Sequence, residues 1–375
     1  MKLLVSTLLF ALALAFAPQV SARGARAGRD EEPQRAAAQE EFQLERRAAA
    51  DPRAVVRLCV ETGDVIVRGW ERAEVRARVS EDGALRLLTP NVTPAPRVEV
   101  LVSNDREADP RPGSCGSNET VELMVPRGAT VDVESRNGHV EVGGVSEARV
   151  RALSGDVDVR RVSQSIEVSC LSGDVSVSDS SGPVRVTTVS GDVEVRNVRN
   201  LSAGDDFEAK STSGDLSLEG VTHRQVRGEV VSGSVLYTGA LARGGSYDFR
   251  TISGEVTMEL PANSSFSLHA KVIASGDIDT DFPVKAAGIS DRTTPAPPAP
   301  PTRGPGASTT RPGMPVPVPA PVVVVVPEPG AGKPGKVKVK VHGEPTQARL
   351  DGTVGTGDAV VNLSSFSGSL HLRRR

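Results

Sequence analysis

The sequence predicts an all-β protein built as a β-solenoid (β-helix), with coils of about 18–22 residues and two main strands in each coil. Three observations support this fold class. A Ser-Gly-Asp phrase recurs along the chain, the residues on both sides of it alternate between apolar and polar, and equivalent positions in successive repeats match one another. Such self-similarity marks a repeat protein, in which each unit buries its core against its neighbours.

The recurring phrase places a glycine every 17 to 23 residues from Gly138 onward. Glycine suits a tight turn because it adopts positive φ without a Cβ clash. The copies are Asn137-Gly138-His139, Ser154-Gly155-Asp156, Ser172-Gly173-Asp174, Ser190-Gly191-Asp192, Ser213-Gly214-Asp215, Ser232-Gly233-Ser234, Ser253-Gly254-Glu255 and Ser275-Gly276-Asp277, with outlying copies at Thr62-Gly63-Asp64 and Ser367-Gly368-Ser369. Each repeat is therefore predicted as a strand, a Ser-Gly turn, a second strand and a longer turn.

Both predicted strands of a repeat alternate with period two, the period of a β-strand. The third residue before each glycine is small or polar in five repeats, at Ala152, Cys170, Thr188, Ser211 and Thr251. Stacked coils bring such equivalent positions into contact, whereas an antiparallel meander that closes as a sandwich or barrel does not need them to match. The pattern favours the solenoid, with the meander as the alternative. Alternating runs between Gly63 and Gly138 predict further strands joined by degenerate turns.

Five segments are predicted along the chain. Residues 1–22 have the charged start, apolar stretch and small-residue cleavage site of a signal peptide, and no later segment is long enough to span a membrane. Residues 23–41 are predicted as a disordered tether, 42–287 as the solenoid, and 288–335 as a proline-rich linker with 14 of the 27 prolines. Residues 336–375 are predicted to supply C-terminal strands or the last coils.

Composition and motifs argue against several functions. The net charge is −3 and aromatic residues make up 3% of the chain, which does not suit nucleic-acid binding. Signatures of serine hydrolases, zinc proteases, dithiol redox proteins and P-loop nucleotide binders are missing. The five histidines are scattered over unrelated positions and are predicted as exposed polar residues. No catalytic or cofactor-binding residue is therefore predicted, and the protein is not expected to be an enzyme.

One arrangement has a possible chemical consequence, a row of carboxylates just after the turn glycines. We call this row the acidic ladder: Asp156, Asp174, Asp192, Asp215 and Asp277, with Asp64 and Glu255 at the same position. Stacked coils would set neighbouring carboxylates about 4.8 Å apart, and rows of carboxylates can supply ligands to Ca²⁺. The alternative, which we favour, is that these residues stabilise the turns and keep the sheet soluble. No cofactor is therefore predicted, with Ca²⁺ as the one candidate.

The three cysteines have different predicted roles. Cys170 lies in the inward column of small residues and is predicted as a core residue. Cys59 lies at an outward position and Cys115 in a glycine-containing loop. An exported protein meets an oxidising compartment, which permits a Cys59–Cys115 disulfide.

The repeated phrase, the exported start and the closing Ser365-Phe366-Ser367-Gly368-Ser369-Leu370-His371-Leu372 resemble the bacterial putative-adhesin family over about residues 42–285 and 336–373. The resemblance implies a β-helical envelope protein of uncharacterised function, and it carries over no catalytic or ligand residues.

Three functions remain open at this stage. The favoured one is an exported, non-enzymatic, adhesin-like solenoid in the periplasm or at the surface of a bacterium, which binds an envelope or cell-surface polymer, matrix or protein through its flat repeat faces. The alternatives are a structural scaffold of the envelope, which assembles by stacking coil ends or docks a partner through the linker, and a polysaccharide-acting enzyme. The sequence leaves the oligomeric state open.

Overall fold

The structure is a computed structural model that describes residues 44–79, 83–105, 109–286, 324–327, 337–340 and 348–375. These residues form strands and turns, and none of them belongs to a helix that could cross a membrane. The predicted signal peptide (1–22), the tether (23–41) and most of the proline-rich linker lie outside the described residues.

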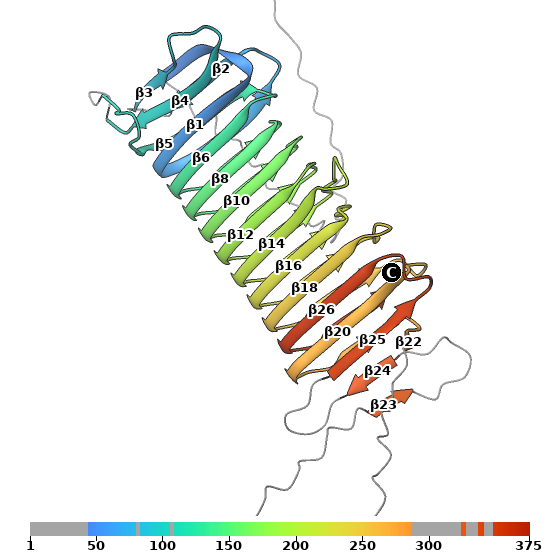
Figure 1. The fold of residues 1–375 in the computed structure, drawn as a ribbon. Helices are drawn as coiled ribbons and strands as arrows, with labels where there is room; N and C mark the ends of the chain where they lie inside the picture. The colour runs from blue at the N-terminus through green and yellow to red at the C-terminus, as the bar shows by residue number, and fades with distance from the viewer. Residues whose placement is uncertain (1–43, 80–82, 106–108, 287–323, 328–336, 341–347) are drawn as a thin grey trace, which may run out of the picture. The chain divides into compact units, whose positions relative to one another are not determined.

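The repeats form a stack of coils in which each long strand, a Ser-Gly turn and a short strand follow one another (Figure 1). Every long strand pairs in parallel with the long strands of the neighbouring coils, and the short strands do the same. The seven consecutive coils are β6 (Thr130–Asn137) with β7 (Val140–Gly143), β8 (Glu147–Ser154) with β9 (Val157–Arg160), β10 (Ser165–Ser172) with β11 (Val175–Ser178), β12 (Val184–Ser190) with β13 (Val193–Arg196), β14 (Asp206–Ser213) with β15 (Leu216–Glu219), β16 (Gln225–Ser232) with β17 (Val235–Thr238), and β18 (Ser246–Ser253) with β19 (Val256–Leu260).

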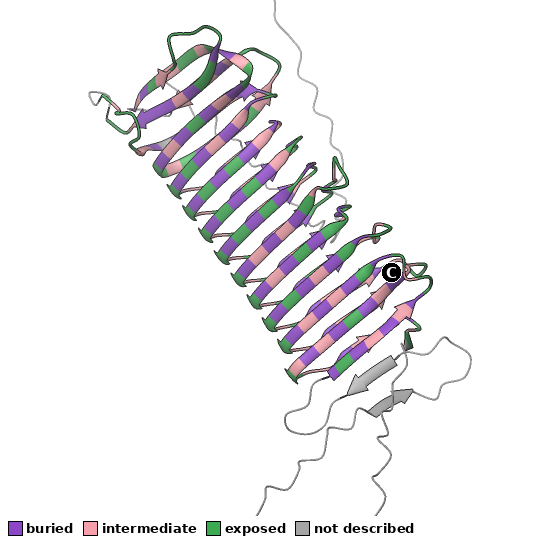
Figure 2. Ribbon diagram, in the orientation of Figure 1, coloured by how far each residue is buried: buried purple, intermediate pink, exposed green. Residues whose placement is uncertain are grey.

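Equivalent positions of successive coils lie side by side, as the matched columns predicted. Cys170 pairs with Ala152 on one side and Thr188 on the other, and Thr188 pairs with Ser211. Buried and exposed residues alternate along each strand (Figure 2). Valine fills most of the core, and larger rings such as Tyr237, Tyr247 and Phe249 fill it in the later coils. The parallel ladders confirm the solenoid and exclude the meander.

The turn glycines are needed because neighbouring coils approach closely there. Gly191 has a φ of 127°, which side chains rarely tolerate. A Cβ on this residue would lie 2.2 Å from the carbonyl oxygen of Gly173 in the coil before it. The same contact repeats between the turns on either side, for example between Gly173 and Gly155.

The N-terminal end of the stack is closed by antiparallel strands. β1 (Leu44–Trp70) runs through the Gly63 turn and pairs in parallel with β6 and β7 on one side and with β4 (Ala95–Ser103) and β5 (Gly116–Pro126) on the other. Beyond them, β3 (Ala84–Leu88) pairs antiparallel with β4, and β2 (Glu74–Val79) pairs antiparallel with β5 and with the start of β1. The three alternating runs between Gly63 and Gly138 form β2, β4 and β5, but β2 caps the stack instead of adding a coil, as does β3, which the alternation did not predict.

The C-terminal residues form a coil that lies out of sequence order. β26 (Val360–Ser367) and β27 (Leu370–Arg374) stand between β18 and β19 on one side and β20 (Phe266–Ser275) and β21 (Ile278–Thr280) on the other, as Figure 1 shows for β26. Leu363 pairs with Phe249 and with Ala270, so its buried column continues without a break. The last coil in the sequence is therefore the second to last in space.

The C-terminal end of the stack is also antiparallel. β25 (Ala348–Val354) pairs with β20 and with β22 (Lys285–Ala286), and β24 (Val337–Lys340) pairs with β21. β23 (Val324–Pro327) pairs with β24. This last strand lies inside the segment 288–335 that was predicted as a proline-rich linker.

Candidate interaction surface along the stack

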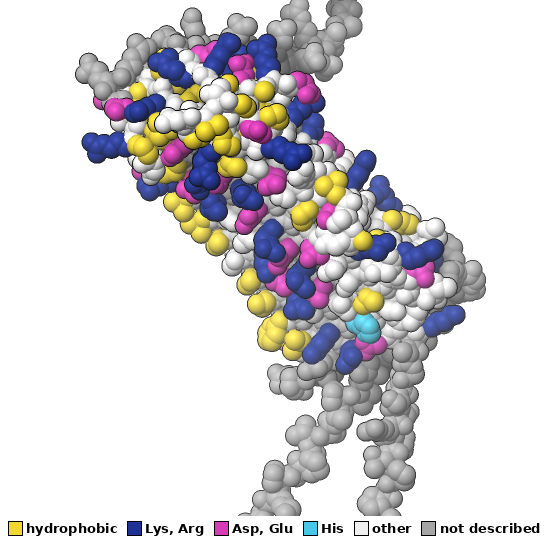
Figure 3. Space-filling model, turned by 45° about the horizontal axis from the view of Figure 1, so that its top comes forward, with side chains coloured by type: hydrophobic (Ala, Val, Ile, Leu, Met, Phe, Trp, Pro, Cys, Tyr) yellow, Lys and Arg dark blue, Asp and Glu magenta, His cyan; other side chains and the backbone are white. Residues whose placement is uncertain are grey.

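A row of apolar side chains is exposed along the stack, at the position two residues before the turn glycines. We call this row the edge ladder: Leu153 (50% exposed), Leu171 (46%), Val189 (41%), Val231 (42%), Ile252 (53%) and Phe366 (51%). Figure 3 shows hydrophobic side chains following one long margin of the stack. Because neighbouring coils are in register, successive members of the row lie about 4.8 Å apart, interrupted only by Thr212.

The edge ladder borders two hollows that meet at Thr187 and Val189. One has a volume of about 550 Å³ and reaches from Cys59 to Val189, and the other, of about 540 Å³, reaches from Thr187 to Phe366. Together they form a groove across the outward face of the long strands. The two hollows together follow the long strands from β1 to β26.

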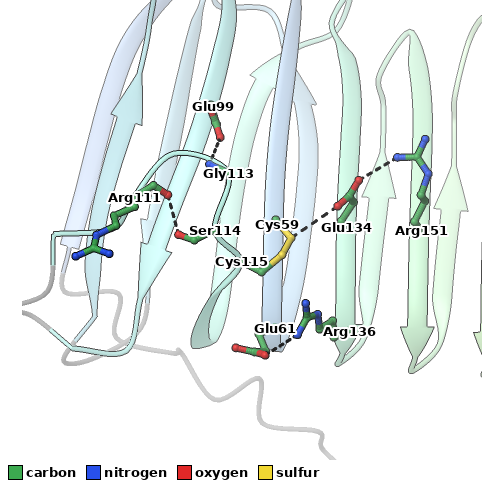
Figure 4. Close-up of a disulfide and its surroundings, with 10 residues drawn as sticks. All are labelled: Cys59, Glu61, Glu99, Arg111, Gly113, Ser114, Cys115, Glu134, Arg136 and Arg151. Carbon is green, nitrogen blue, oxygen red and sulfur yellow. Dashed lines mark hydrogen bonds and ion pairs between the residues drawn. A yellow bond between two sulfur atoms is a disulfide. The ribbon is translucent and has the colours of Figure 1, made fainter.

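A disulfide lies at the N-terminal end of the groove (Figure 4). Cys59 of β1 is bonded to Cys115, which precedes β5, with their Cα atoms 4.6 Å apart. The loop before Cys115 is held by a hydrogen bond from the backbone N–H of Gly113 to the carboxylate of Glu99, 3.0 Å long. The disulfide therefore fixes this loop against β1, which forms the first coil.

Charged side chains lie beside the edge ladder, at the position four residues before the turn glycines. Arg151 contacts Glu134 at 3.1 Å (Figure 4), and Lys210 contacts Glu208 at 2.8 Å. The hydrogen bond from Lys210 lowers the pKa of Glu208 below its ordinary value, even though partial burial acts in the opposite direction. Charged residues, among them Arg151, Lys210 and Arg250, therefore line the groove together with the edge ladder.

The acidic ladder lies on the other side of the edge ladder, and most of its carboxylates hold the turns together. Asp174 Oδ1 accepts a hydrogen bond from the backbone N–H of Asp192 at 2.8 Å, and Asp192 Oδ1 does the same for Asp215. Asp156 binds the N–H of Asp174, and Asp215 that of Ser234. Asp277 occupies the same turn position in the coil of β20 and β21.

This bonding pattern favours the structural interpretation of the acidic ladder. One oxygen of each bonded carboxylate already accepts an N–H from the next coil, which reduces what it can offer a cation. Among the described residues, no group of three or more His, Cys, Asp or Glu side chains is arranged to hold a metal ion.

Cys170 and His223 are titratable groups that lie in the core. Cys170 is in the core as predicted, and burial raises the pKa of its thiol. His223 was predicted to be exposed, and this was wrong. It is fully buried beside Phe207, with Nε2 2.8 Å from the carbonyl oxygen of Gly182, and burial lowers its pKa. The turn that carries it folds inward, which the repeat pattern does not indicate.

The edge ladder itself was missed by the sequence analysis. Its members stand directly before the Ser-Gly pair, at Leu153, Leu171, Val189, Val231, Ile252 and Phe366. This column could have been found by asking which outward position is apolar in most coils, because an exposed position has no structural need for an apolar side chain.

Comparison with known proteins shows which family and which solved structures the chain is similar to. A model of the family described as Toastrack DUF4097 matches residues 64–294. No curated protein matches the chain. Two solved structures do, each with 10% sequence identity: a putative adhesin from Parabacteroides merdae, with a TM-score of 0.35 over 58% of this chain and 89% of that one, and a putative cell adhesion protein from Clostridium sporogenes, with a TM-score of 0.21 over 88% of this chain and 99% of that one.

Proposed function

The chain belongs to the Toastrack DUF4097 family, and from this premise we propose that it is an exported, non-enzymatic, adhesin-like solenoid that binds an elongated envelope or cell-surface partner along its edge ladder. The observation that carries the proposal is the row of six large apolar side chains, each 41–53% exposed, along one groove. Contiguous exposed apolar surface costs stability in water and marks interaction sites in soluble proteins.

The export part of the proposal is supported by the sequence of residues 1–22 and by the Cys59–Cys115 bond. Disulfides persist in oxidising compartments and are rare in the cytosol. The proposal places the protein in the periplasm or at the surface of a bacterium.

Neither alternative function gains support from the coils. A scaffold that grows by stacking coil ends needs open parallel edges, but both ends of the described stack carry antiparallel strands. A glycosidase needs two carboxylates that flank a scissile bond in a cleft, whereas the acidic ladder lies outside the groove and is bonded to backbone N–H groups.

Binding of the purified protein to insoluble envelope material from the producing cells tests the proposal. We expect the double variant Leu171→Glu/Ile252→Glu to bind at least about tenfold more weakly, since a charge replaces each desolvated apolar contact. The matched control is Leu236→Glu, because Leu236 is 38% exposed on the short-strand face, away from the edge ladder. Equal binding by all three proteins, or none by the wild type, would overturn the proposal.

A further inference from the structure

We propose that a second copy of this chain docks on the edge ladder, with the two stacks side by side, parallel, and related by a two-fold axis along the stack. The inference rests on the proposed function, because it names a partner for the same ladder. Its experiment can nevertheless fail while the proposed function stands.

The edge ladder is complementary to itself when two copies meet. Its apolar side chains recur at the coil spacing of about 4.8 Å, and an identical row has the same spacing. Leu171 of one copy would then meet Leu171 of the other, and Ile252 would meet Ile252. An isologous contact of this kind buries the same patch on both subunits.

In three coils the two sides of the edge ladder carry opposite charges. The residue four before each turn glycine and the residue just after it never carry the same charge in any of the described coils. The charged pairs are Arg151 with Asp156, Lys210 with Asp215, and Arg250 with Glu255. In the coil where the first position is Glu229, the second is Ser234 rather than an acid.

Contacts inside one chain do not account for this matching. Lys210 contacts Glu208 and Glu229, and Arg250 contacts Asp248, so these cations are paired along their own face. The acids beyond the edge ladder also have partners inside the chain, because Asp215 accepts the backbone N–H of Ser234 and Glu255 lies 3.4 Å from His371. The pairs are separated by the ladder itself.

A two-fold rotation about an axis parallel to the stack brings each pair together. It exchanges the two sides of the edge ladder and keeps every coil at its own level, so Arg250 faces Glu255 of the second copy and Lys210 faces its Asp215. An antiparallel arrangement would instead place one acidic ladder against the other, which is repulsive. Charge complementarity therefore selects the parallel pair.

The size of the contact fits a weak dimer. The edge ladder runs over seven coils, from Leu153 to Phe366, and so spans six coil spacings, or about 29 Å. The strip between the two charged positions is five residues wide, about 16 Å. A strip of these dimensions covers about 460 Å² per copy, less than the roughly 800 Å² of standard interfaces. Antiparallel strands cover both ends of the described stack, so we place the contact between identical copies along its side.

Sedimentation velocity of the full-length mature protein, at protein concentrations from about 1 to 100 μM, tests the proposal. The wild type and Leu236→Glu should sediment as dimers, and Leu171→Glu/Ile252→Glu as a monomer. Arg250→Glu should weaken the dimer at least about tenfold, and Arg250→Glu combined with Glu255→Arg should restore it. The double variant restores the dimer only if residue 250 of one copy pairs with residue 255 of the other copy across the two-fold axis.

A cross-link separates the two orientations. Leu153 lies near one end of the edge ladder, so Leu153→Cys should form a disulfide between two copies in the parallel pair, whereas an antiparallel pair would place it beside Phe366. A monomeric wild type at the highest concentration, or no cross-link, overturns the inference. If such a monomer still binds envelope material through the edge ladder, the proposed function stands and the partner is not a second copy.

Discussion

At the scale of single residues, the turn glycine is the most constrained position of the repeat. Its φ lies between 112° and 146° in the turns from Gly155 onward, and its backbone lies against the carbonyl of the neighbouring turn. A side chain at this position would require an unfavourable φ and would also clash with the carbonyl of the neighbouring turn. The recurring glycine, which was the first signal in the sequence, is therefore a requirement of the coil spacing.

Replacing Gly191 with alanine should lower the free energy of unfolding by about 2–6 kcal/mol. The strained φ contributes about 1–3 kcal/mol, and the forced contact with Gly173 contributes about 1–3 kcal/mol more. Chemical denaturation measures this loss. Gly204→Ala is the control, because an added Cβ meets nothing within 4 Å there, and an equal effect of both variants would contradict the explanation.

His223 should make the stability depend on pH. Burial lowers its pKa below the ordinary value of 6.5, although the hydrogen bond to Gly182 and the charges of Asp205 and Asp206 oppose this. The folded state holds the imidazole neutral, so its contribution is fully present above pH 6.5. It is lost as the pH falls below 6.5, because the unfolded chain then binds the proton more tightly. Nδ1 has no hydrogen-bond partner in the described part of the chain, so a proton placed there would be buried without an acceptor.

Denaturant midpoints of the wild type and of His223→Gln between pH 7.5 and 5 measure this contribution. We expect the wild type to lose more stability over this range than the variant does. Parallel curves for the two proteins would show that another group controls the acid sensitivity.

At the scale of elements, period-two alternation identified the strands but not the order of the coils. The connection from Leu260 to Phe266 rises by two coil spacings, about 9.6 Å, and leaves room for one coil. The segment Val360–Arg374 fills it, with matching buried columns on both sides. Alternation reports which face of a strand is buried, and it contains no information on which neighbour the strand meets.

Deleting residues 360–375 should expose four parallel edges and destabilise the last coils. Val361, Leu363, Leu370 and Leu372 are each at most 1% exposed, and each contributes about 1.5–3 kcal/mol by burial. We expect increased binding of a hydrophobic dye and aggregation through the open edges.

A peptide of residues 358–375 added to the truncated protein should reverse both effects. The same peptide with Leu363→Asp and Leu370→Asp should not, because each charge would enter a buried column. If the truncated protein behaves like the full chain, the inserted coil does not stabilise its neighbours.

At the scale of the whole molecule, stability depends on closing the stack. Parallel coils expose unpaired strand edges at each end, and such edges promote aggregation. β2 and β3 cover one end and β22 to β25 the other. The Cys59–Cys115 bond ties the loop before β5 to the first coil, so it acts on the N-terminal closure.

Reduction of this disulfide should lower the free energy of unfolding by up to about 4 kcal/mol. The bonded residues are 56 positions apart, and closing a loop of that length in the unfolded chain has an entropic effect of about this size. Thermal melting with and without reductant measures it. The variant Cys59→Ser/Cys115→Ser should melt at the lower temperature and ignore the reductant, whereas a wild type unaffected by reduction would contradict the prediction.

The sequence by itself determined the coil. The spacing of the glycines, the alternation around them and the small-residue column through Cys170 and Thr188 are local and periodic, and a stack of similar units obeys nearest-neighbour rules. For the same reason it indicated that the acidic ladder stabilises turns. Only the tertiary structure decided the insertion of the last coil, the antiparallel caps, the burial of His223 and the groove beside the edge ladder. These depend on contacts between segments far apart in the chain, and a period read along one strand does not record them.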